Sequence, residues 1–370
     1  MRWIAEAAAG SRALVATLAV ALAVAGAGAA QAQLYQGPMA SELSPQFYAW
    51  LRQHSDAFFA AYMTPDGRVF DPENGGITHS ESQAYGMAIA YDANDAETFD
   101  RIWTWTRDTL RNADGLHAWR YEPGRGVVDR NNATDADLII AAMLSLAAKR
   151  WNRGDYLRAA VQTASTLGDA VLLRHEGVVV MLPGRSGFTR PSQPDGPVVN
   201  LSYYHFDVMR IVADLDPSHP WDEAISAGLD FYERVVDAWI PSDWTSVADP
   251  QSPVPAERFP RRASYDAVRG PINLLAIPWD RQGELLRIVD RRFASHGAVP
   301  GIYDPHRGVR TADLAGTGYE LIAAAVHCAA TGTQVPMRFF AFRPETYFSS
   351  ALQLLVIHQL YTKYPRCIPI

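Results

Sequence analysis

Three carboxylic acids stand at comparable places along the chain, each where a loop turns into an apolar run of helical character. Glu81 follows the loop DPENGGITHS, Asp135 opens the run DADLIIAAMLSLAAKRW, and Asp266 precedes AVRGPINLL. An acid in the first turn of a helix ordinarily serves as a cap and stabilises it by about 0.5–2 kcal/mol. Two carboxylates that meet in a cleft can instead divide the acid and base work of glycoside hydrolysis between them.

Aromatic and polar residues accompany the three acids, and their presence together favours a shared cleft over three separate caps. Tyr85 lies one turn after Glu81, and Tyr265 and Arg269 flank Asp266. Aromatic rings on a cleft wall offer flat apolar surface on which sugar rings can stack. If alternate helices of a toroid begin at the same end, the three junctions converge on one site.

The helical period of apolar residues dominates the elements that must position these acids. Short strand-like pieces are limited to HAWRYEP and GVVVMLPG, and no fixed-length repeat is visible. This pattern predicts an all-α fold in which pairs of helices form a toroid. The predicted helices cover 44–62, 81–93, 95–112, 135–151, 155–173, 202–214, 221–238, 266–277, 282–295, 315–330 and 346–362.

The N-terminus carries the pattern of an export signal. The apolar run ALVATLAVALAVAGAGAA is followed by the cleavage pattern AQA, which predicts a signal peptide over 1–32 and a mature domain over 33–370. An uncleaved membrane anchor is the alternative. It is less favoured, because a run rich in alanine and glycine partitions only weakly into a membrane. We expect a periplasmic or secreted protein with no membrane span after cleavage.

Charge and cysteine usage narrow the function classes. A net charge of −7 and a pI near 5.8 give no basic surface for nucleic acid. The two cysteines, Cys328 and Cys367, could form a disulfide in an exported protein or remain buried thiols, and the sequence leaves both open. Two cysteines without a histidine cluster give no metal site, and no cofactor is expected.

Two segments resemble signatures of glycoside hydrolase family 8. ATDADLIIAAMLSLAAKRW at 133–151 is similar to the family's signature through Asp135 and Asp137, and HSESQAYGM at 79–87 is similar to the segment that bears the general acid. Ser82 departs from that second pattern, because the family usually has glycine there.

Further segments extend the resemblance over nearly the whole mature chain. SYDAVR at 264–269 resembles the segment that carries the catalytic base. HAWRY at 117–121 is similar to the segment with a sugar-stacking tryptophan, represented here by Trp119, although the next two residues depart from the family pattern. The family resemblance implies an (α/α)6 barrel and hydrolysis with inversion at the anomeric carbon.

The resemblance also implies a role for each acid. Glu81 is the expected general acid, Asp266 the general base, and Asp135 the residue that holds the sugar at the cleavage subsite. A general acid must keep its proton at the working pH, whereas Arg269, one turn beyond Asp266, is expected to keep that base ionised. Asp137 points away from Asp135 on a helix and is interpreted as a structural acid. The expected substrate-binding residues are Trp119, Tyr121, Tyr203, Tyr265, Arg269 and Gln83.

The substrate is less well specified than the mechanism. The likeness is to the branch of the family encoded beside bacterial cellulose synthases, which implies endo-hydrolysis of β-1,4-glucan and the cellulose synthase machinery as a partner. Chitosan, xylan and lichenan remain alternative substrates, because the family includes enzymes for each. A non-catalytic glycan-binding protein on the same fold is the alternative from another class, and a D-x-D motif of a glycosyltransferase is a weaker one.

Overall fold

The computed structural model describes residues 45–238, 241–277, 280–295 and 300–369. Helices, alternately buried and half-exposed, make up most of these residues. Contacts between residues divide the chain into Met1–Glu42 and Leu43–Ile370, and all described residues belong to the second unit. The predicted signal peptide, 1–32, lies outside the described residues.

Eleven α-helices occur in the described part of the chain, and their positions agree closely with those predicted. The predicted helix at 202–214 is divided into the 3-10 helix η3 (Leu201–Tyr203) and α7, and the one at 266–277 into η4 (Ala267–Arg269) and α9. The helices are α2 (Pro45–Tyr62), α3 (Ser80–Asp92), α4 (Ala96–Thr109), α5 (Thr134–Trp151), α6 (Gly154–Val171), α7 (Phe206–Leu215), α8 (Trp221–Ala238), α9 (Gly270–Leu275), α10 (Asp280–Ser295), α11 (Thr317–Thr331) and α12 (Tyr347–Lys363).

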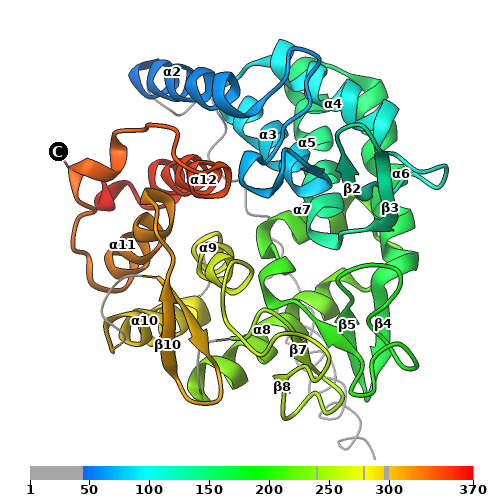
Figure 1. Cartoon of the computed structure of the whole chain (residues 1–370), viewed down its shortest axis with the longest axis vertical. Helices are drawn as coiled ribbons and strands as arrows, with labels where there is room; N and C mark the ends of the chain where they lie inside the picture. Colours follow the sequence, from blue (N-terminus) through cyan, green and yellow to red (C-terminus); the bar gives the residue numbers. More distant parts are fainter. Residues whose placement is uncertain (1–44, 239–240, 278–279, 296–299, 370) are drawn as a thin grey trace, which may run out of the picture. The chain divides into compact units, whose positions relative to one another are not determined.

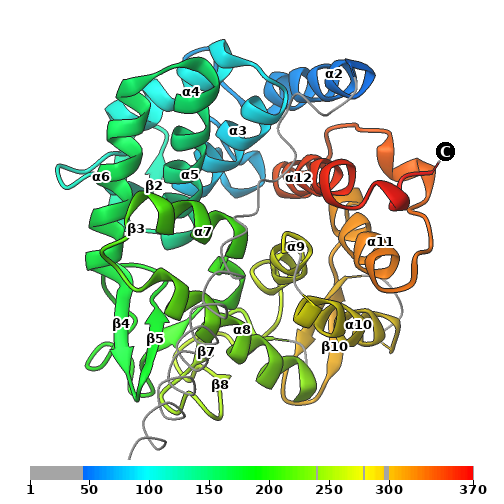
Figure 2. The ribbon, with the colours of Figure 1, turned by 180° about the vertical axis from the view of Figure 1, so that it is seen from behind.

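Six of these helices form a closed inner ring (Figures 1 and 2). They contact one another in the order α3, α5, α7, α9, α11 and α12, and α12 returns to α3. The other five described helices, α2, α4, α6, α8 and α10, pack outside the ring. Between α11 and α12 the chain has the short 3-10 helix η5 (Met337–Phe340) in place of an outer helix. The arrangement is an (α/α)6 barrel, and the predicted fold class is confirmed.

The burial of each helix follows from its sequence. The inner helix α3 has ten buried residues among its thirteen, and its small residues allow close packing on every side. A β-carbon at Gly86 would lie 2.8 Å from a methyl carbon of Val69, so only glycine fits there without a shift. The outer helix α4 instead buries one stripe, which includes Phe99, Ile102 and Trp103.

The inner helices begin at the same end of the barrel. An outer helix separates each of the first four from the next along the chain, so the first five share a direction. The last two are parallel as well, because the amide of Gly318 at the start of α11 donates to Ser349 Oγ at the start of α12 at 3.0 Å. At the opposite end, Cys328 of α11 forms a disulfide with Cys367, just beyond α12.

Short antiparallel strands occupy the loops that precede the inner helices. Two of them, β2 and β5, correspond to the predicted strand-like pieces, and the others were not predicted. The two Pro/Gly-rich loops at 184–200 and 241–264 contribute to one sheet, in which β7 pairs with both β6 and β8. The strands are β1 (Thr78–His79), β2 (Ala118–Glu122), β3 (Gly126–Asn132), β4 (Leu172–His175), β5 (Val178–Met181), β6 (Val198–Val199), β7 (Thr245–Ser246), β8 (Val254–Pro255), β9 (Gly301–Asp304) and β10 (Val309–Asp313).

No helix among the described residues is both long and apolar enough to cross a membrane.

Candidate active site

One buried arginine gathers the three carboxylates that the sequence singles out. The side chain of Arg269 is only 2 % exposed. Its Nη1 donates to Glu81 Oε2, to Asp135 Oδ2 at 3.0 Å and to the Tyr85 hydroxyl at 3.2 Å. Its Nη2 donates to Asp266 Oδ1 at 2.6 Å. The predicted convergence of the three loop-to-helix junctions is therefore what the structure contains.

Glu81 is free for this contact because another residue caps its helix. The backbone amide of Ser82 donates to Nδ1 of His79, the N-cap residue of α3, at 3.2 Å. Glu81 itself lies in the first turn with its side chain 15 % exposed. Glu81 therefore forms an ion pair with a residue far away in sequence and does not cap its own helix.

Asp135 lies deeper than Glu81, at the start of α5, with no exposed side-chain surface. Burial, together with the neighbouring charge of Glu81, raises the pKa of Asp135 to about 6, and Arg269 opposes the shift. His205 is buried nearby, and burial lowers its pKa to about 4, so it is neutral at neutral pH. The cluster therefore takes up a proton near pH 6 on a carboxyl and not on the histidine.

Asp266 is the most exposed of the three acids, with 28 % of its side chain accessible, and it directly precedes η4. Burial raises its pKa above the ordinary value, and Arg269 reduces the shift without reversing it. The contact with Arg269 is as expected from the sequence, but the net direction of the shift is opposite, because the sequence does not reveal how strongly the site is desolvated.

Aromatic side chains surround the cluster. The guanidinium carbon of Arg269 lies 5.4 Å from the ring centre of Tyr203 and 5.8 Å from that of Phe348. Tyr265 is half-exposed, and its ring lies 6.4 Å from that of Phe348. Phe348 was not predicted, although its place in the first turn of α12 puts it at the same end of the barrel as the acids.

The predicted platform residues Trp119 and Tyr121 lie on β2, beside the start of α3. Thr78 of β1, two residues before α3, pairs with Tyr121. Both aromatic side chains are half-buried, and Tyr121 packs edge-on against Trp105 at 5.3 Å. The hairpin thus brings exposed aromatic surface near the helix that carries Glu81.

Gln83 is not accessible to a substrate, and its prediction as a binding residue is wrong. Its side chain is fully buried between α3, α4 and the loop that precedes α3. Its oxygen accepts from the Val69 amide at 2.6 Å, and its nitrogen donates to Thr106 Oγ1 at 2.8 Å and to the carbonyls of Ile102 and Gly67. Every polar atom of the side chain is used to join these elements.

Asp137 has the structural place that was expected for it. It is fully buried, and its Oδ1 accepts from the backbone amide of His117 at 3.1 Å and lies 2.7 Å from Nδ1 of the same residue. Its Oδ2 accepts from Asn132 Nδ2 at 3.1 Å. These bonds join the start of α5 to both ends of the β2–β3 hairpin.

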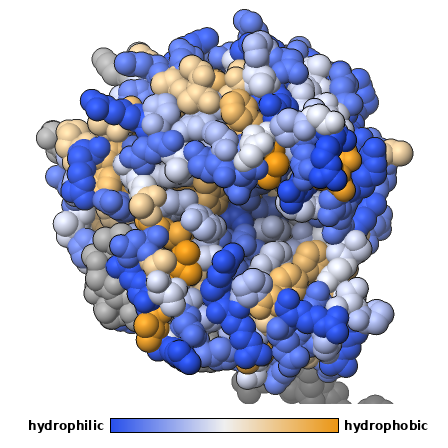
Figure 3. Space-filling view, in the orientation of Figure 1, coloured by the Kyte–Doolittle hydropathy of each residue, from blue (hydrophilic) through white to orange (hydrophobic). Residues whose placement is uncertain are grey.

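The face that carries the starts of the inner helices is hollowed near its middle. Figure 3 shows mainly hydrophilic residues in the depth of this hollow, over the region that α3, α9 and α12 enclose in Figure 1. Among the described residues there is no group of three or more histidine, cysteine, aspartate or glutamate side chains arranged to hold a metal ion. The described residues of the site are carboxylates, one guanidinium and aromatic rings.

Comparison with known proteins agrees with this geometry. The family model described as "Glycosyl hydrolases family 8" matches residues 39–363. The chain belongs to glycoside hydrolase family 8. A "Probable endoglucanase" of Novacetimonas hansenii is 34% identical over 81% of this chain and 87% of its own length. The structure of "endo-beta-1,4-glucanase CMCax from Acetobacter xylinum" has a TM-score of 0.73 at 32% identity and covers 85% of this chain and 99% of the other.

A further relative and a further structure fit the same family. An "Endoglucanase" of Cellulomonas uda is 33% identical over 62% of this chain and 67% of its own. The family 8 endoglucanase Cel10 from Klebsiella pneumoniae has a TM-score of 0.72 at 29% identity and covers 83% of this chain and 98% of the other. The resemblance noted in the sequence is confirmed, and the protein is a glycoside hydrolase.

Proposed function

We propose that this glycoside hydrolase cleaves β-1,4-glucan internally with inversion at the anomeric carbon, and that Glu81 is its general acid and Asp266 its general base. The observation that carries the proposal is the contact of one guanidinium with both carboxylates and with Asp135. The substrate class follows the relatives, whose names are endoglucanase and endo-β-1,4-glucanase.

The arrangement supports separate roles for the two outer carboxylates. Glu81 and Asp266 bind different nitrogens of Arg269, so the guanidinium holds the two carboxylates apart. An inverting pair needs a separation of about 6.5–9.5 Å, because a water must fit between the base and the sugar. Asp266 is the more exposed of the two, which supports its assignment as the base that activates this water.

The proton for the leaving oxygen has a source within the cluster. Asp135 takes up a proton near pH 6, and the contact with Glu81 is one cause of that raised pKa. The cluster thus holds a proton on a carboxyl up to about pH 6, and Glu81, which is partly exposed whereas Asp135 is not, delivers it to the glycosidic oxygen. Asp135 then remains to hold the sugar hydroxyls at the cleavage subsite.

Export to the periplasm or the outside, and action beside a cellulose synthase, complete the proposal. The apolar run and cleavage pattern before position 33 support export. The Cys328–Cys367 disulfide supports it as well, because disulfides persist mainly in oxidising compartments. Secretion can be checked by locating the protein, and by sequencing the N-terminus of the mature chain, which we expect to be Gln33.

The central experiment measures reducing ends released from carboxymethylcellulose by the wild type and by Glu81→Gln and Asp266→Asn. Each substitution is nearly isosteric and removes one proton-transfer group, so we expect kcat to fall by about 10²–10⁴-fold with the fold retained, as judged by the circular dichroism spectrum. Activity near that of the wild type in either folded variant would remove that residue from its role. A silent wild type would redirect the search to chitosan, xylan and lichenan.

The stereochemical outcome is a separate prediction. An inverting enzyme releases the α-anomer first from a β-linked chain, because water enters from the face opposite to the leaving group. Proton NMR of cellopentaose hydrolysis during the first minutes, before mutarotation, distinguishes the two anomers. An initial β-anomer would contradict inversion while leaving the hydrolase assignment intact.

A further inference from the structure

A buried aspartate outside the catalytic cluster holds the turn that carries the proposed base. Asp243 lies in the loop between α8 and β7 and is 3 % exposed. Its Oδ1 accepts from the backbone amides of Ser264 at 2.6 Å and Ala267 at 3.1 Å, and its Oδ2 accepts from the Ser264 hydroxyl. These two residues flank Asp266, so one side chain fixes both sides of the turn on which the base stands.

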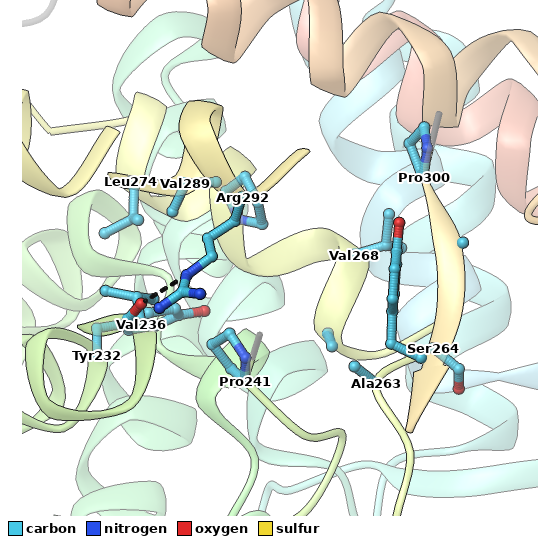
Figure 4. A pocket seen from close by; sticks show the side chains of 14 residues that line it. Tyr232, Val236, Pro241, Ala263, Ser264, Val268, Leu274, Val289, Arg292 and Pro300 are labelled. Carbon is cyan, nitrogen blue, oxygen red and sulfur yellow. Dashed lines mark hydrogen bonds between the residues drawn. The ribbon is translucent and has the colours of Figure 1, made fainter. Parts of the chain in front are cut away.

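The same turn also borders a pocket. The pocket's lining includes Ala263, Ser264, Ala267 and Val268, and Ala263 and Ser264 are each only 2 % exposed. Figure 4 shows Ala263, Ser264 and Val268 on one wall and Tyr232, Leu274 and Val289 across the space. On the pocket side the backbone of Ala263 pairs with that of Tyr303, and nearer to Asp266 the turn is held by the hydrogen bonds of Ser264 and Ala267 to Asp243.

We propose that Asp243 is the positioning residue for Asp266, fixing the direction of the base towards the attacking water. The proposal deepens the function proposed above and rests on Asp266 being the base. A second consequence follows from charge. Asp243 is itself an acid, so a like charge stands beside Asp266 and opposes its ionisation.

Several groups face Asp266, and their effects differ in sign. Arg269 and the amide of Asn200 favour the ionised form, whereas burial, Asp243 and Asp135 favour the protonated form. Tyr203, also in contact range of these charges, stays protonated, because burial raises its pKa. Asp243 differs from the others in that it contacts the backbone of the turn and not the carboxylate of Asp266.

Two substitutions separate the charge of Asp243 from its hydrogen bonds. Asp243→Asn keeps an oxygen that can accept from both amides but removes the charge. It also leaves Arg262, whose Nε lies 3.4 Å from Asp243 Oδ2, without that partner, and both changes lower the pKa of Asp266. The base then stays ionised to lower pH, and the acid limb of the kcat/KM profile moves down by on the order of half a pH unit. Asp243→Ala removes the acceptor, and we expect kcat to fall at least about tenfold with KM within about twofold.

A matched control comes from the same loop. Asp249 is exposed and accepts from the amide of Gln251, two residues along, and Asp249→Asn removes an equal charge without touching the turn. The titration of Asp266 is also read directly, by NMR of protein labelled with ¹³Cγ-aspartate, in which Asp266→Asn identifies the resonance. This readout needs no substrate, so it separates failure of this inference from failure of the proposed function.

In Asp243→Asn we expect a lower pKa of Asp266 and an acid limb of the kcat/KM profile that lies at lower pH. In Asp243→Ala we expect kcat to fall while KM changes little. The control Asp249→Asn should behave like the wild type. An Asp266 titration unchanged in Asp243→Asn would overturn the inference even if no variant were active. An Asp243→Ala protein with lower thermal stability but wild-type kcat would also overturn the inference, because Asp243 would then stabilise the fold without positioning the base.

Discussion

At the scale of single residues, the site is an ion cluster with more negative than positive charge in a place with little water. Arg269 forms ion pairs with Glu81, Asp135 and Asp266 and is almost fully buried. Burying charge is costly, and the attraction between partners offsets that cost only where geometry is good. The raised pKa of Asp135 shows that the offset is incomplete. The site is therefore expected to lower the stability of the fold.

Replacing Asp135 with asparagine should reveal this effect as a function of pH. A raised folded-state pKa means that Asp135 lowers stability as pH rises from its unfolded value of 3.8 to about 6. Asparagine does not titrate, so the free energy of unfolding of Asp135→Asn should gain on that of the wild type by up to about 3 kcal/mol between pH 4 and pH 7. Urea denaturation at several pH values measures the difference.

A difference between Asp135→Asn and wild type that stays constant with pH, or that turns against the variant as pH rises, would contradict the raised pKa. The role proposed for Asp135 predicts, in addition, lower activity at every pH, because the charged acceptor for the sugar hydroxyls is removed.

The acids of the cluster could be predicted from the sequence more reliably than the roles of the residues next to them in each motif. Glu81, Asp135 and Asp266 could be located because each stands at a helix start beside polar residues. Gln83 was wrongly assigned although it lies in the same motif as Glu81. Two residues on a helix are turned by about 200° from each other, so Gln83 points into the protein while Glu81 faces the cleft. Proximity in sequence did not imply a shared face.

At the scale of elements, the starts of the inner helices are the parts that make the site. Partners from other segments cap several of these starts. The amide of Tyr347 in α12 donates to Glu73, and that of Thr317 in α11 donates to Glu345. His79 performs this task for α3 through its Nδ1, with Nε2 3.6 Å from Asp71 Oδ2. For α3, the cap supplied by His79 leaves Glu81 available to contact Arg269.

Substitution of His79 tests the link between capping and catalysis. His79→Ala removes the acceptor for the Ser82 amide, which should cost about 0.5–2 kcal/mol of stability and reduce kcat several-fold as the first turn frays around Glu81. His79→Asn supplies an effective N-cap and should recover most of both losses. Chemical denaturation and kcat are measured on each variant. Equal losses in the two variants would show that the ring packing of His79, and not its cap, is what matters.

Elements with a strong period were predictable, and those without one were not. Helix positions could be predicted within a few residues because apolar residues recur with the helical period. The strands β6, β7 and β8 each have two residues, lie in Pro/Gly-rich loops, and pair Val198 with Ser246 and Val254 with Ser246. No alternation is visible over two residues, and the pairing joins separate loops, so the contacts of Asp243 could not be foreseen either.

At the scale of the whole barrel, the first and last inner helices must meet for the ring to close. α12 packs on α3 and α11, so the C-terminal helix completes the wall next to Glu81. The segment 332–346 links the last two helices with little regular structure, and the Val335 amide donates to the Cys367 carbonyl at 2.8 Å. Closure of the ring therefore depends on contacts made by α12 and by the residues around Cys367.

The disulfide between Cys328 and Cys367 is expected to stabilise this closure without affecting catalysis. The bond joins residues 39 apart, and the loop it closes corresponds to about 4 kcal/mol of lost chain entropy in the unfolded state. It lies at the ends of α11 and α12, whereas the carboxylates lie at the starts of the inner helices. The double variant Cys328→Ser, Cys367→Ser should therefore unfold at lower urea concentration and keep its kcat at 25 °C. Wild-type protein treated with reductant under denaturing conditions and refolded is the matching control. A variant with unchanged stability but reduced kcat would mean that the two ends of the barrel are coupled more tightly than the ring of parallel helices implies.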